Sequence, residues 1–424
     1  METIQSISAI QVLDSRGNPT LKVNVKTENF SGWAVVPSGA STGIHEALEL
    51  RDGKKPYSGR GVEKAAQIIN KELSKELAGI PITDQVKIDG TMLDLDRTEN
   101  KSRIGGNTMI GVSLAAARAG AASEKKELYE YLAQMYGNRE KPCLPVPLAN
   151  VINGGKHAGN GLKFQEFLLI PRRVSSFAEA TQAVTETYHA LKGIISERYG
   201  AQATGLGDEG GFAPPIKSAQ EALALIAEAI HKAGYNRAIA IGTDVASSTF
   251  FVDGKYDLGT PMGTDELISY YTQLADKYSL RSIEDPFAED DVSAWPQIMQ
   301  KLAKKRKIQI VGDDLTVTSE QRVRMAASKG MCNAMILKTN QVGTLTEALA
   351  AAKAAAASGW EIIVSHRSGD TEDAFMADLA VGIGASQIKL GAPARAERTA
   401  KYNRLLEIES RLQRKEYAGK KLRF

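Results

Sequence analysis

The chain of 424 residues has only two cysteines, Cys143 and Cys332. Two thiols are too few for a disulfide framework or a cysteine-based zinc site, so we expect both to pack as small apolar side chains. Lysine and arginine number 53 against 50 aspartates and glutamates, which gives a formal charge of +3 without any block of like charge. This balance argues against a nucleic-acid partner or a membrane anchor and favours a small-molecule partner.

Long hydrophobic runs are also missing. No uninterrupted apolar stretch would span a bilayer, and the first residues, METIQSISAIQVLD, have neither the basic nor the apolar region of a secretory signal. We therefore expect a cytoplasmic protein. The phosphate loop with a Walker lysine, the HExxH zinc helix and the nucleophile elbow of hydrolases are absent as well, so the chemistry must come from other groups.

The length suits a barrel-sized domain plus a smaller one. Before residue 138 lie two segments with alternating polarity, SISAIQVLDS and LKVNVKTEN, followed by helical patterns. They predict a small α+β domain over residues 1–138. The stretch YGNREKPCLPVP, rich in proline and charge, is the predicted linker, and residues 144–424 form the second domain.

The second domain alternates short apolar runs with amphipathic or alanine-rich helical patterns. The later runs are AIAIGTD, YSLRSIED, IQIVGDD, AMILKTN, EIIVSHR and ASQIKLG. Such alternation over about 280 residues predicts a parallel sheet with helical crossovers, and the size is typical of a β/α barrel. A doubly wound open sheet is the alternative. The predicted fold is therefore α/β, with a C-terminal β/α barrel and an N-terminal α+β capping domain.

Each of these six runs ends in a polar or charged group. The six are Asp244, Glu284, Asp313, Lys338, His366 and Lys389. Singly, each could be a helix cap or a turn residue. In a barrel, however, the ends of all parallel strands meet at one mouth, where active sites lie, so we expect the six side chains to face one another.

The charges of this set indicate its chemistry. Asp244, Glu284 and Asp313 cannot be held close together without a cation, and an all-oxygen set suits Mg²⁺ better than Zn²⁺. A lysine near other cations and partly desolvated can become neutral enough to accept a proton, which makes Lys338 a candidate base. Arg367, next to a serine and a glycine in SHRSGDTED, has the forked donors that hold a phosphate or carboxylate. A phosphorylated acid is the substrate class that fits.

Two glycine-rich stretches have the composition of functional loops. GDEGGFAPP, residues 207–215, predicts a fixed irregular backbone, although glycine, proline and aspartate also build plain turns. VINGGKHAGNGLKFQEF, residues 151–167, carries His157, Gln165 and Glu166. A lone histidine is more often structural, so composition alone leaves His157 without a role.

Many motifs in order resemble the enolase family. They are LDSRGNPT, PSGASTGIHEALELRD, NGGKHAGN, QEF, GDEGGFAP, SIEDPF, GDDLTVT, LKTNQVGT, SHRSGDTED and GAPARAERTAKYNRLLEIE. The resemblance runs from about residue 7 to residue 410, and NGGKHAGN is similar to the prokaryotic members. It implies an enolase-type barrel and a lyase of glycolysis and gluconeogenesis, a phosphopyruvate hydratase. Such enzymes dehydrate 2-phosphoglycerate to phosphoenolpyruvate through an ene-diolate with two Mg²⁺ per site.

The resemblance also implies roles for individual residues. The implied metal-site residues are Asp244, Glu284, Asp313 and, from the lid, Ser41. The implied acid–base group comprises Lys338 as base, Glu209 as acid and Glu166 beside that acid. The implied substrate contacts are His157, Gln165, His366, Arg367, Ser368 and Lys389.

The family resemblance implies a homodimer or a tetramer of dimers. Two alternatives stay open at this point. One is a binding or scaffold protein on an enolase fold, and the other is a dehydratase of the wider superfamily acting on another carboxylate.

Overall fold

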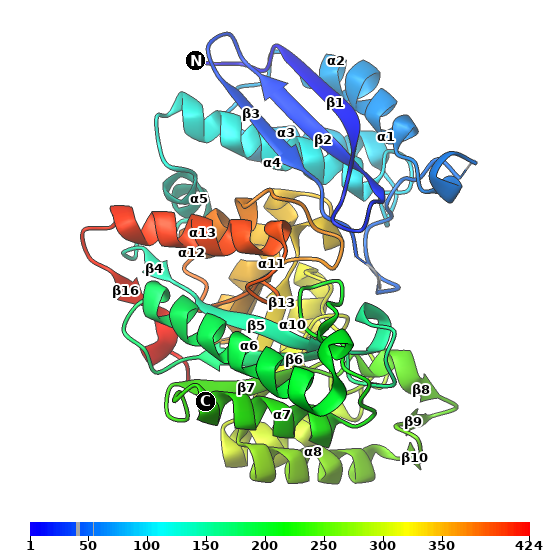
Figure 1. The fold of residues 1–424 in the computed structure, drawn as a ribbon. Coiled ribbons are helices and arrows are strands. Elements are labelled where there is room, and N and C mark those ends of the chain that lie inside the picture. The colour runs from blue at the N-terminus through cyan, green and yellow to red at the C-terminus, as the bar shows by residue number, and fades with distance from the viewer. Residues whose placement is uncertain (40–42, 54) are drawn as a thin grey trace.

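The computed structural model describes residues 1–39, 43–53 and 55–424, which form a small N-terminal domain packed against a larger barrel (Figure 1). The N-terminal domain begins with a meander of antiparallel strands, β1 (Ser6–Leu13), β2 (Pro19–Lys26) and β3 (Ser31–Val35). Alternate β2 side chains, Leu21, Val23 and Val25, are fully buried, because successive residues of a strand face opposite sides. The alternation in the sequence thus decides which face of the sheet packs inward.

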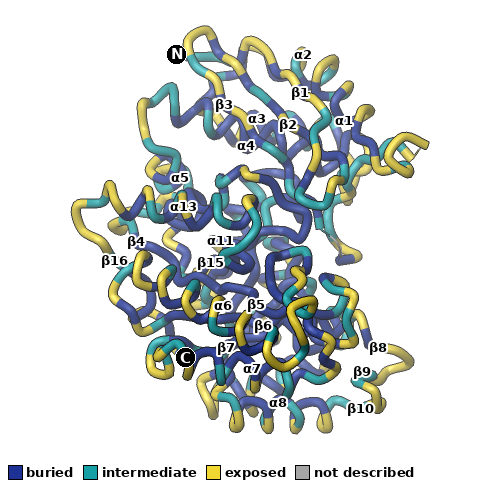
Figure 2. Tube along the Cα trace, viewed as in Figure 1, coloured by how far each residue is buried: buried dark blue, intermediate teal, exposed yellow. Residues whose placement is uncertain are grey.

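Helices α1 (Glu63–Ile68), α2 (Ser74–Glu76) and α4 (Gly106–Ser123) pack on the sheet. Helices α3 (Gln85–Asp96) and α5 (Leu128–Tyr136) pack on α4. Helix α4 contributes the most, since almost all of its small side chains are buried against β2 and β3. Figure 2 shows the dark, buried centre of both domains and the exposed loops around them.

Within the described residues, eight strands close a barrel in the second domain. In chain order they are β5 (Val146–Asn153), β6 (Glu166–Pro171), β7 (Ile239–Asp244), β11 (Leu280–Glu284), β12 (Gln309–Gly312), β13 (Ala334–Leu337), β14 (Glu361–Ser365) and β15 (Gln387–Lys389). This closed barrel confirms the predicted fold class and rules out the open sheet.

One strand departs from the predicted parallel sheet. Strand β6 runs antiparallel to both of its neighbours, β5 and β7, whereas the other barrel pairs are parallel. The connection between β5 and β6 contains only the one-turn helix Gly155–His157, so it returns the chain directly, as a hairpin does. Two helices, α6 (Phe177–Tyr199) and α7 (Ala219–Lys232), then lead from β6 to β7.

The remaining barrel helices lie outside the strands. They are α8 (Thr264–Tyr278), α9 (Trp295–Ile298), α10 (Glu320–Ser328), α11 (Leu345–Ala357), α12 (Phe375–Gly382) and α13 (Ala396–Arg411). Four of the barrel helices have a serine or threonine at the N-cap. Its hydroxyl oxygen accepts a hydrogen bond from the backbone N–H of the residue three positions later, which would otherwise be unpaired. These N-caps are Ser176, Ser218, Ser319 and Thr344.

Short strands complete the domain. Strands β8 (Phe251–Val252), β9 (Lys255–Asp257) and β10 (Pro261–Met262) form a small separate sheet, and β4 (Cys143–Leu144) pairs with β16 (Glu416–Tyr417) near the C-terminus. Both cysteines are buried and unbonded, as expected. In the described part of the chain, no helix combines the length and apolarity needed to cross a membrane.

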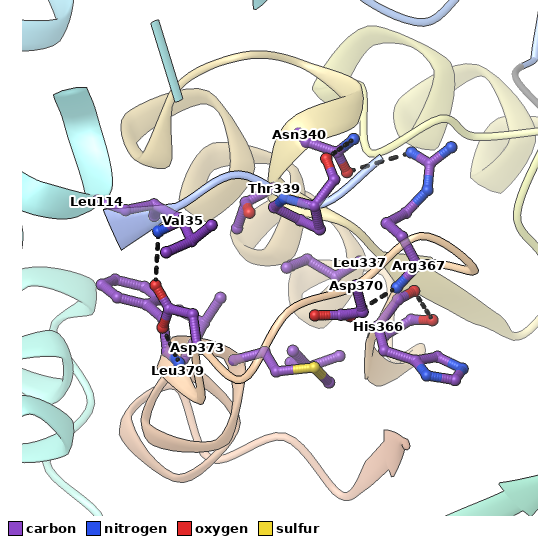
Figure 3. A pocket seen from close by; sticks show the side chains of 15 residues that line it. Val35, Leu114, Leu337, Thr339, Asn340, His366, Arg367, Asp370, Asp373 and Leu379 are labelled. Carbon is purple, nitrogen blue, oxygen red and sulfur yellow. Dashed lines mark hydrogen bonds between the residues drawn. The ribbon is translucent and has the colours of Figure 1, made fainter. Parts of the chain in front are cut away.

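A charged contact joins the two domains. Arg118 of α4 forms an ion pair with Asp373 of the barrel domain, and its guanidinium lies 4.5 Å from the ring centre of Trp33 and 5.3 Å from that of Phe375. Asp373 also accepts a 2.9 Å bond from the Val35 amide. Val35, Asp373 and Phe375 line a cavity whose wall mixes apolar side chains with polar and charged ones (Figure 3).

Candidate active site

The six predicted strand-end groups lie at one mouth of the barrel. Asp244, Glu284 and Lys389 are the last residues of β7, β11 and β15. Asp313, Lys338 and His366 directly follow β12, β13 and β14. Because the strands pair in register, their ends lie side by side around a cavity of about 500 Å³. The reversed direction of β6 brings its first residue, Glu166, level with Asp244 at the same mouth.

Lys389 is the centre of one charged group. Its ammonium lies 2.9 Å from Glu166, 2.9 Å from Glu284 and 3.2 Å from Asp244, and its side chain is only 2% exposed. Burial disfavours the charged amine, but these carboxylates hold the pKa of Lys389 well above its usual range. Gln165 adds a 3.4 Å bond to Asp244.

Lys338 forms the second charged contact, with Asp313. Burial works against the charged amine, yet the Asp313 carboxylate raises the pKa of Lys338. A raised pKa favours the protonated amine, which is the opposite of the lowered pKa expected for Lys338 as the predicted base. Gln341 donates a 3.0 Å bond to the other carboxylate oxygen of Asp313 and fixes its orientation.

Two further aspartates support this region. Asp285 accepts 2.9 Å bonds from the backbone amides of Asp313 and Asp314, which sets the turn after β12. One carboxylate oxygen from each of Asp285, Asp313 and Asp314 lies within 4.8 Å of the other two. Burial and then Asp313 raise the pKa of Asp314 to about 8.

The carboxylates at the mouth suit a hard divalent cation. Asp244, Glu284 and Asp313 are all buried. Burial and the neighbouring Asp244 hold the pKa of Glu284 well above its usual range, because the negative charges outnumber the nearby lysines. A divalent cation would offset this excess, and oxygen-only ligands are those that hard cations prefer.

A pair of glutamates occupies the other side of the cavity. A ligand atom from each of Glu166, Glu209 and His157 lies within 4.8 Å of the other two. Burial and the charge of Glu209 hold the pKa of Glu166 well above its usual range. Burial also opposes ionisation of Glu209, but His366 and His157 beside it hold its pKa well below that range. The pKa values of the two glutamates are therefore shifted in opposite directions, and Glu166 is the one whose protonated form is favoured.

Glu209 is presented by a rigid turn. Its carboxylate accepts a 3.0 Å bond from Asn150 of β5 and lies 3.3 Å from Nε2 of His366. The adjacent Gly210 has φ of +81°, and a Cβ there would come within 2.8 Å of the Ala394 carbonyl oxygen. Only glycine fits this position, so GDEGGFAPP forms the fixed irregular backbone that its composition predicts.

The buried Arg398 of α13 connects this turn to the loop after β14. Its guanidinium donates bonds to His366 Nδ1 at 2.5 Å and to the carbonyl oxygens of Arg367 at 2.6 Å, Ser368 at 2.7 Å and Asp208 at 3.1 Å. Because Nδ1 of His366 accepts a bond, the neutral ring carries its proton on Nε2, which faces Glu209. Burial lowers the pKa of His366 to about 4, so the ring is neutral near pH 7.

Arg367 forms an ion pair with Glu46 of the N-terminal domain. Its guanidinium lies 2.9 Å from the carboxylate of Glu46 and donates a 3.1 Å bond to Asn340, the contact drawn in Figure 3. Despite burial, Glu46 raises the pKa of Arg367. Ser368 lines the same cavity, whereas Ser41 lies outside the described residues.

The structure therefore brings together every predicted site residue that it describes. It also adds groups that the sequence reasoning missed, namely Glu46, Asn150, Asp285, Asn340, Gln341 and Arg398. Asn150 and Asp285 left a signal, since one interrupts an apolar run and the other directly follows Glu284. Arg398 left no signal in the sequence, because its position in an amphipathic helix does not distinguish it from other arginines.

The barrel and its mouth define an enzyme that pairs acid–base groups with a carboxylate site for a cation. Two family models match the chain, the enolase C-terminal TIM barrel domain over residues 141–424 and the enolase N-terminal domain over residues 4–132. An enolase of Mastigamoeba balamuthi is 50% identical over 426 residues, covering 97% of this chain and 96% of that protein. An enolase of Methanocaldococcus jannaschii is 49% identical over 422 residues, covering 99% and 98%. The chain belongs to the enolase family.

Family membership confirms the predicted resemblance and enzyme class. The chain is a phosphopyruvate hydratase, a carbon–oxygen lyase of glycolysis that interconverts 2-phosphoglycerate and phosphoenolpyruvate. A divalent metal is implied by the family and fits the buried carboxylates described above.

Proposed function

We propose that this chain performs the dehydration with Lys338 as general base and Glu209 as general acid, in a site for two Mg²⁺ held by Asp244, Glu284, Asp313 and Ser41. The observation that carries the proposal is the convergence of two lysines and a pair of buried glutamates on one cavity. When bound, Mg²⁺ would offset the carboxylate charge and the charge that develops on the ene-diolate.

The base must lose its proton before the reaction begins. The Asp313 carboxylate is what keeps Lys338 charged, so Lys338 can become neutral once the charge of Asp313 is offset. Its amine then removes the proton next to the substrate carboxylate. The nearby cations Arg367 and Lys389 also favour the neutral amine.

The acid delivers a proton to the leaving hydroxide. We assign this step to Glu209, with the proton supplied through the neighbouring Glu166, whose raised pKa favours its protonated form. The amide of Gln165 supports this step, because its Oε1 is buried and accepts no hydrogen bond among the described residues, so it can take one from the substrate hydroxyl. His157 and His366 close the cavity around the two glutamates.

The substrate is held at both ends. Arg367 and Ser368 contact its phosphate, because a guanidinium fork matches phosphate oxygens and both residues line the cavity. Lys389 pairs with its carboxylate and counters the charge that grows there.

We also propose the setting of the enzyme. It is cytoplasmic and forms a homodimer or a tetramer of dimers. The exposed apolar side chains Ile10, Leu13 and Trp33 of the N-terminal sheet favour an interface on that domain. The domain boundary falls between residues 138 and 144, after α5 ends at Tyr136.

The test is the ultraviolet absorbance of phosphoenolpyruvate formed from 2-phosphoglycerate while Mg²⁺ is titrated. Wild type should be active only with the metal, and Lys338→Ala should lose at least about 10²-fold in kcat, the lower range for a general base. The exposed Lys329 provides a matched control, and Lys329→Ala should keep full activity. A silent wild type at saturating Mg²⁺ would favour another superfamily dehydratase or a scaffold role, and an unimpaired Lys338→Ala would remove Lys338 as base.

A further inference from the structure

A second charged cavity lies at the opposite end of the barrel from the active site. Residues 171 and 239 pair at this end, where β6 finishes and β7 begins, whereas Glu166 and Asp244 pair at the active-site mouth. Five residues of extended strand separate the two ends, which is roughly 17 Å at the usual rise of a strand. The cavity has a volume of about 370 Å³.

Cationic side chains dominate its lining, and we call this set the basal cluster. Its members are Arg172, Arg173, Arg237, Lys277 and Arg281. They come from three separate places in the chain, namely the residues just after β6, a residue just before β7, and the end of α8 together with the start of β11. The cluster therefore arises from the fold and leaves no block of charge in the sequence.

Among the residues that the structure describes, none of the five cations forms an ion pair with an acidic side chain, whereas many other lysines and arginines do so. Arg172 is half-buried, and its Nε has no hydrogen-bond partner in the described chain. Burial, and then the like charges of Arg173 and Arg281, lower the pKa of Arg172.

Arg173, Arg237 and Lys277 are exposed, and Arg172 and Arg281 are half-buried, so an anionic ligand can reach the cluster and would relieve the repulsion among its charges. Surface charges of one sign are normally hydrated or paired with acidic side chains. When such charges line a concave surface, their electrostatic potentials add within the cavity. Guanidinium groups offer forked donors that match phosphate oxygens. A single orthophosphate would leave most of the five charges uncompensated, whereas a chain of phosphates would reach several of them.

We propose that the basal cluster is a binding site for a small ligand that carries two or more linked phosphate groups, such as an inorganic or nucleoside polyphosphate. The phosphate chain lies in the cavity between Arg172 and Arg281. The size of the cavity is within the range of small-molecule sites. This inference does not depend on the catalytic roles given above.

Calorimetric titration of the intact enzyme with sodium triphosphate tests the proposal. Wild type should bind one triphosphate per chain at this site, with an affinity that falls as salt is added, and orthophosphate should bind at least about 10-fold more weakly. The double variant Arg237→Gln/Arg281→Gln should lose at least about 10-fold in triphosphate affinity. Its dehydration activity should be unchanged, because both residues are far from the active-site mouth.

A matched control separates the site from a general effect of charge. Arg198→Gln/Arg324→Gln removes the same charge from two arginines that pair with Glu228 and Glu320. It should bind triphosphate like wild type. Equal losses in both double variants, undisturbed binding in Arg237→Gln/Arg281→Gln, or no binding at millimolar triphosphate would each overturn the proposal.

Thermal unfolding measurements show whether a variant that fails to bind triphosphate is still folded. Without ligand, Arg237→Gln/Arg281→Gln should unfold no earlier than wild type, because no ion pair is lost. Triphosphate should raise the unfolding temperature of wild type and leave that of the variant in place. A second pair, Arg173→Gln/Lys277→Gln, should behave in the same way, and a full response to triphosphate in both pairs would exclude the basal cluster as the site.

Discussion

At the scale of single residues, the buried Arg398 determines which ring nitrogen of His366 carries the proton. It binds Nδ1 of His366 and three carbonyl oxygens, so it fixes both the ring tautomer and the two loops around Glu209. We therefore regard Arg398 as a positioning residue. It was invisible in the sequence because its importance comes from contacts with residues 30 to 190 positions away.

Replacing Arg398 should disturb His366 in a measurable way. Arg398→Met should lower kcat by about 10²-fold, the cost of a misplaced group, and should raise the pKa of His366 above its value of about 4, because a nearby positive charge is lost. Nitrogen NMR of the His366 ring reports both tautomer and pKa. Arg398→Lys keeps the charge and should restore the low pKa while recovering only part of kcat. An unchanged His366 pKa in Arg398→Met would show that Arg398 has only a packing role.

The depressed pKa of His366 also affects stability. Below pH 6.5 the unfolded chain takes up a proton on this histidine, but the folded protein does not do so until about pH 4. Falling pH therefore favours unfolding across this window, by up to about 3 kcal/mol at its lower end. The measurement is denaturant unfolding at pH 7 and pH 5 for wild type and His366→Asn, and wild type should lose more stability than the variant. Equal losses would contradict the buried neutral ring.

At the scale of elements, the strand ends were the most predictable part of the site. Asp244, Glu284 and Lys389 end strands, and parallel strands in a barrel must bring such ends together, so their proximity follows from chain pattern alone. The direction of β6 could not be read in this way, because an apolar run has the same pattern in either direction. The short connection between β5 and β6 is the sequence feature that would have indicated the antiparallel direction of β6.

The turn that carries Glu209 provides a test at this scale. Gly210→Ala should destabilise the protein by about 1–3 kcal/mol and reduce kcat, because φ is +81° and the added Cβ would meet the Ala394 carbonyl. Gly193, exposed in the middle of α6 with open space around it, is the matched control. Gly193→Ala should gain about 0.5–1 kcal/mol of stability and keep full activity. Thermal unfolding and the absorbance assay distinguish the two, and a harmless Gly210→Ala would mean that the turn is not fixed.

At the scale of the whole molecule, the excess of buried carboxylates predicts that Mg²⁺ stabilises the fold. The proposed ligands Asp244, Glu284 and Asp313 come from three strands, so the site exists only when the barrel is formed. At 100 times the dissociation constant, the metal should add about 2.7 kcal/mol to the free energy of unfolding. Thermal unfolding with and without a chelator measures this. Glu284→Gln should respond less, and an equal response in the variant would place the metal elsewhere.

The sequence predicted the barrel, the capping domain and the family, but not the protonation state of the site. The raised pKa of Lys338 and the opposite pKa shifts of Glu166 and Glu209 depend on distances of a few ångströms between buried charges. The composition of the sequence and the spacing of its residues do not give the distances between buried charges. The basal cluster was missed for a related reason, since its five cations are scattered along the chain.

The contact between the domains has a spectroscopic consequence. The chain has three tryptophans, and Trp33 is the one stacked on Arg118, whose other side is paired with Asp373 of the barrel domain. Trp295, by contrast, is fully buried within the barrel domain. With Trp360 replaced by phenylalanine, the two remaining tryptophans report separate events: emission from Trp33 reports whether the N-terminal domain is seated on the barrel, and emission from Trp295 reports whether the barrel is intact.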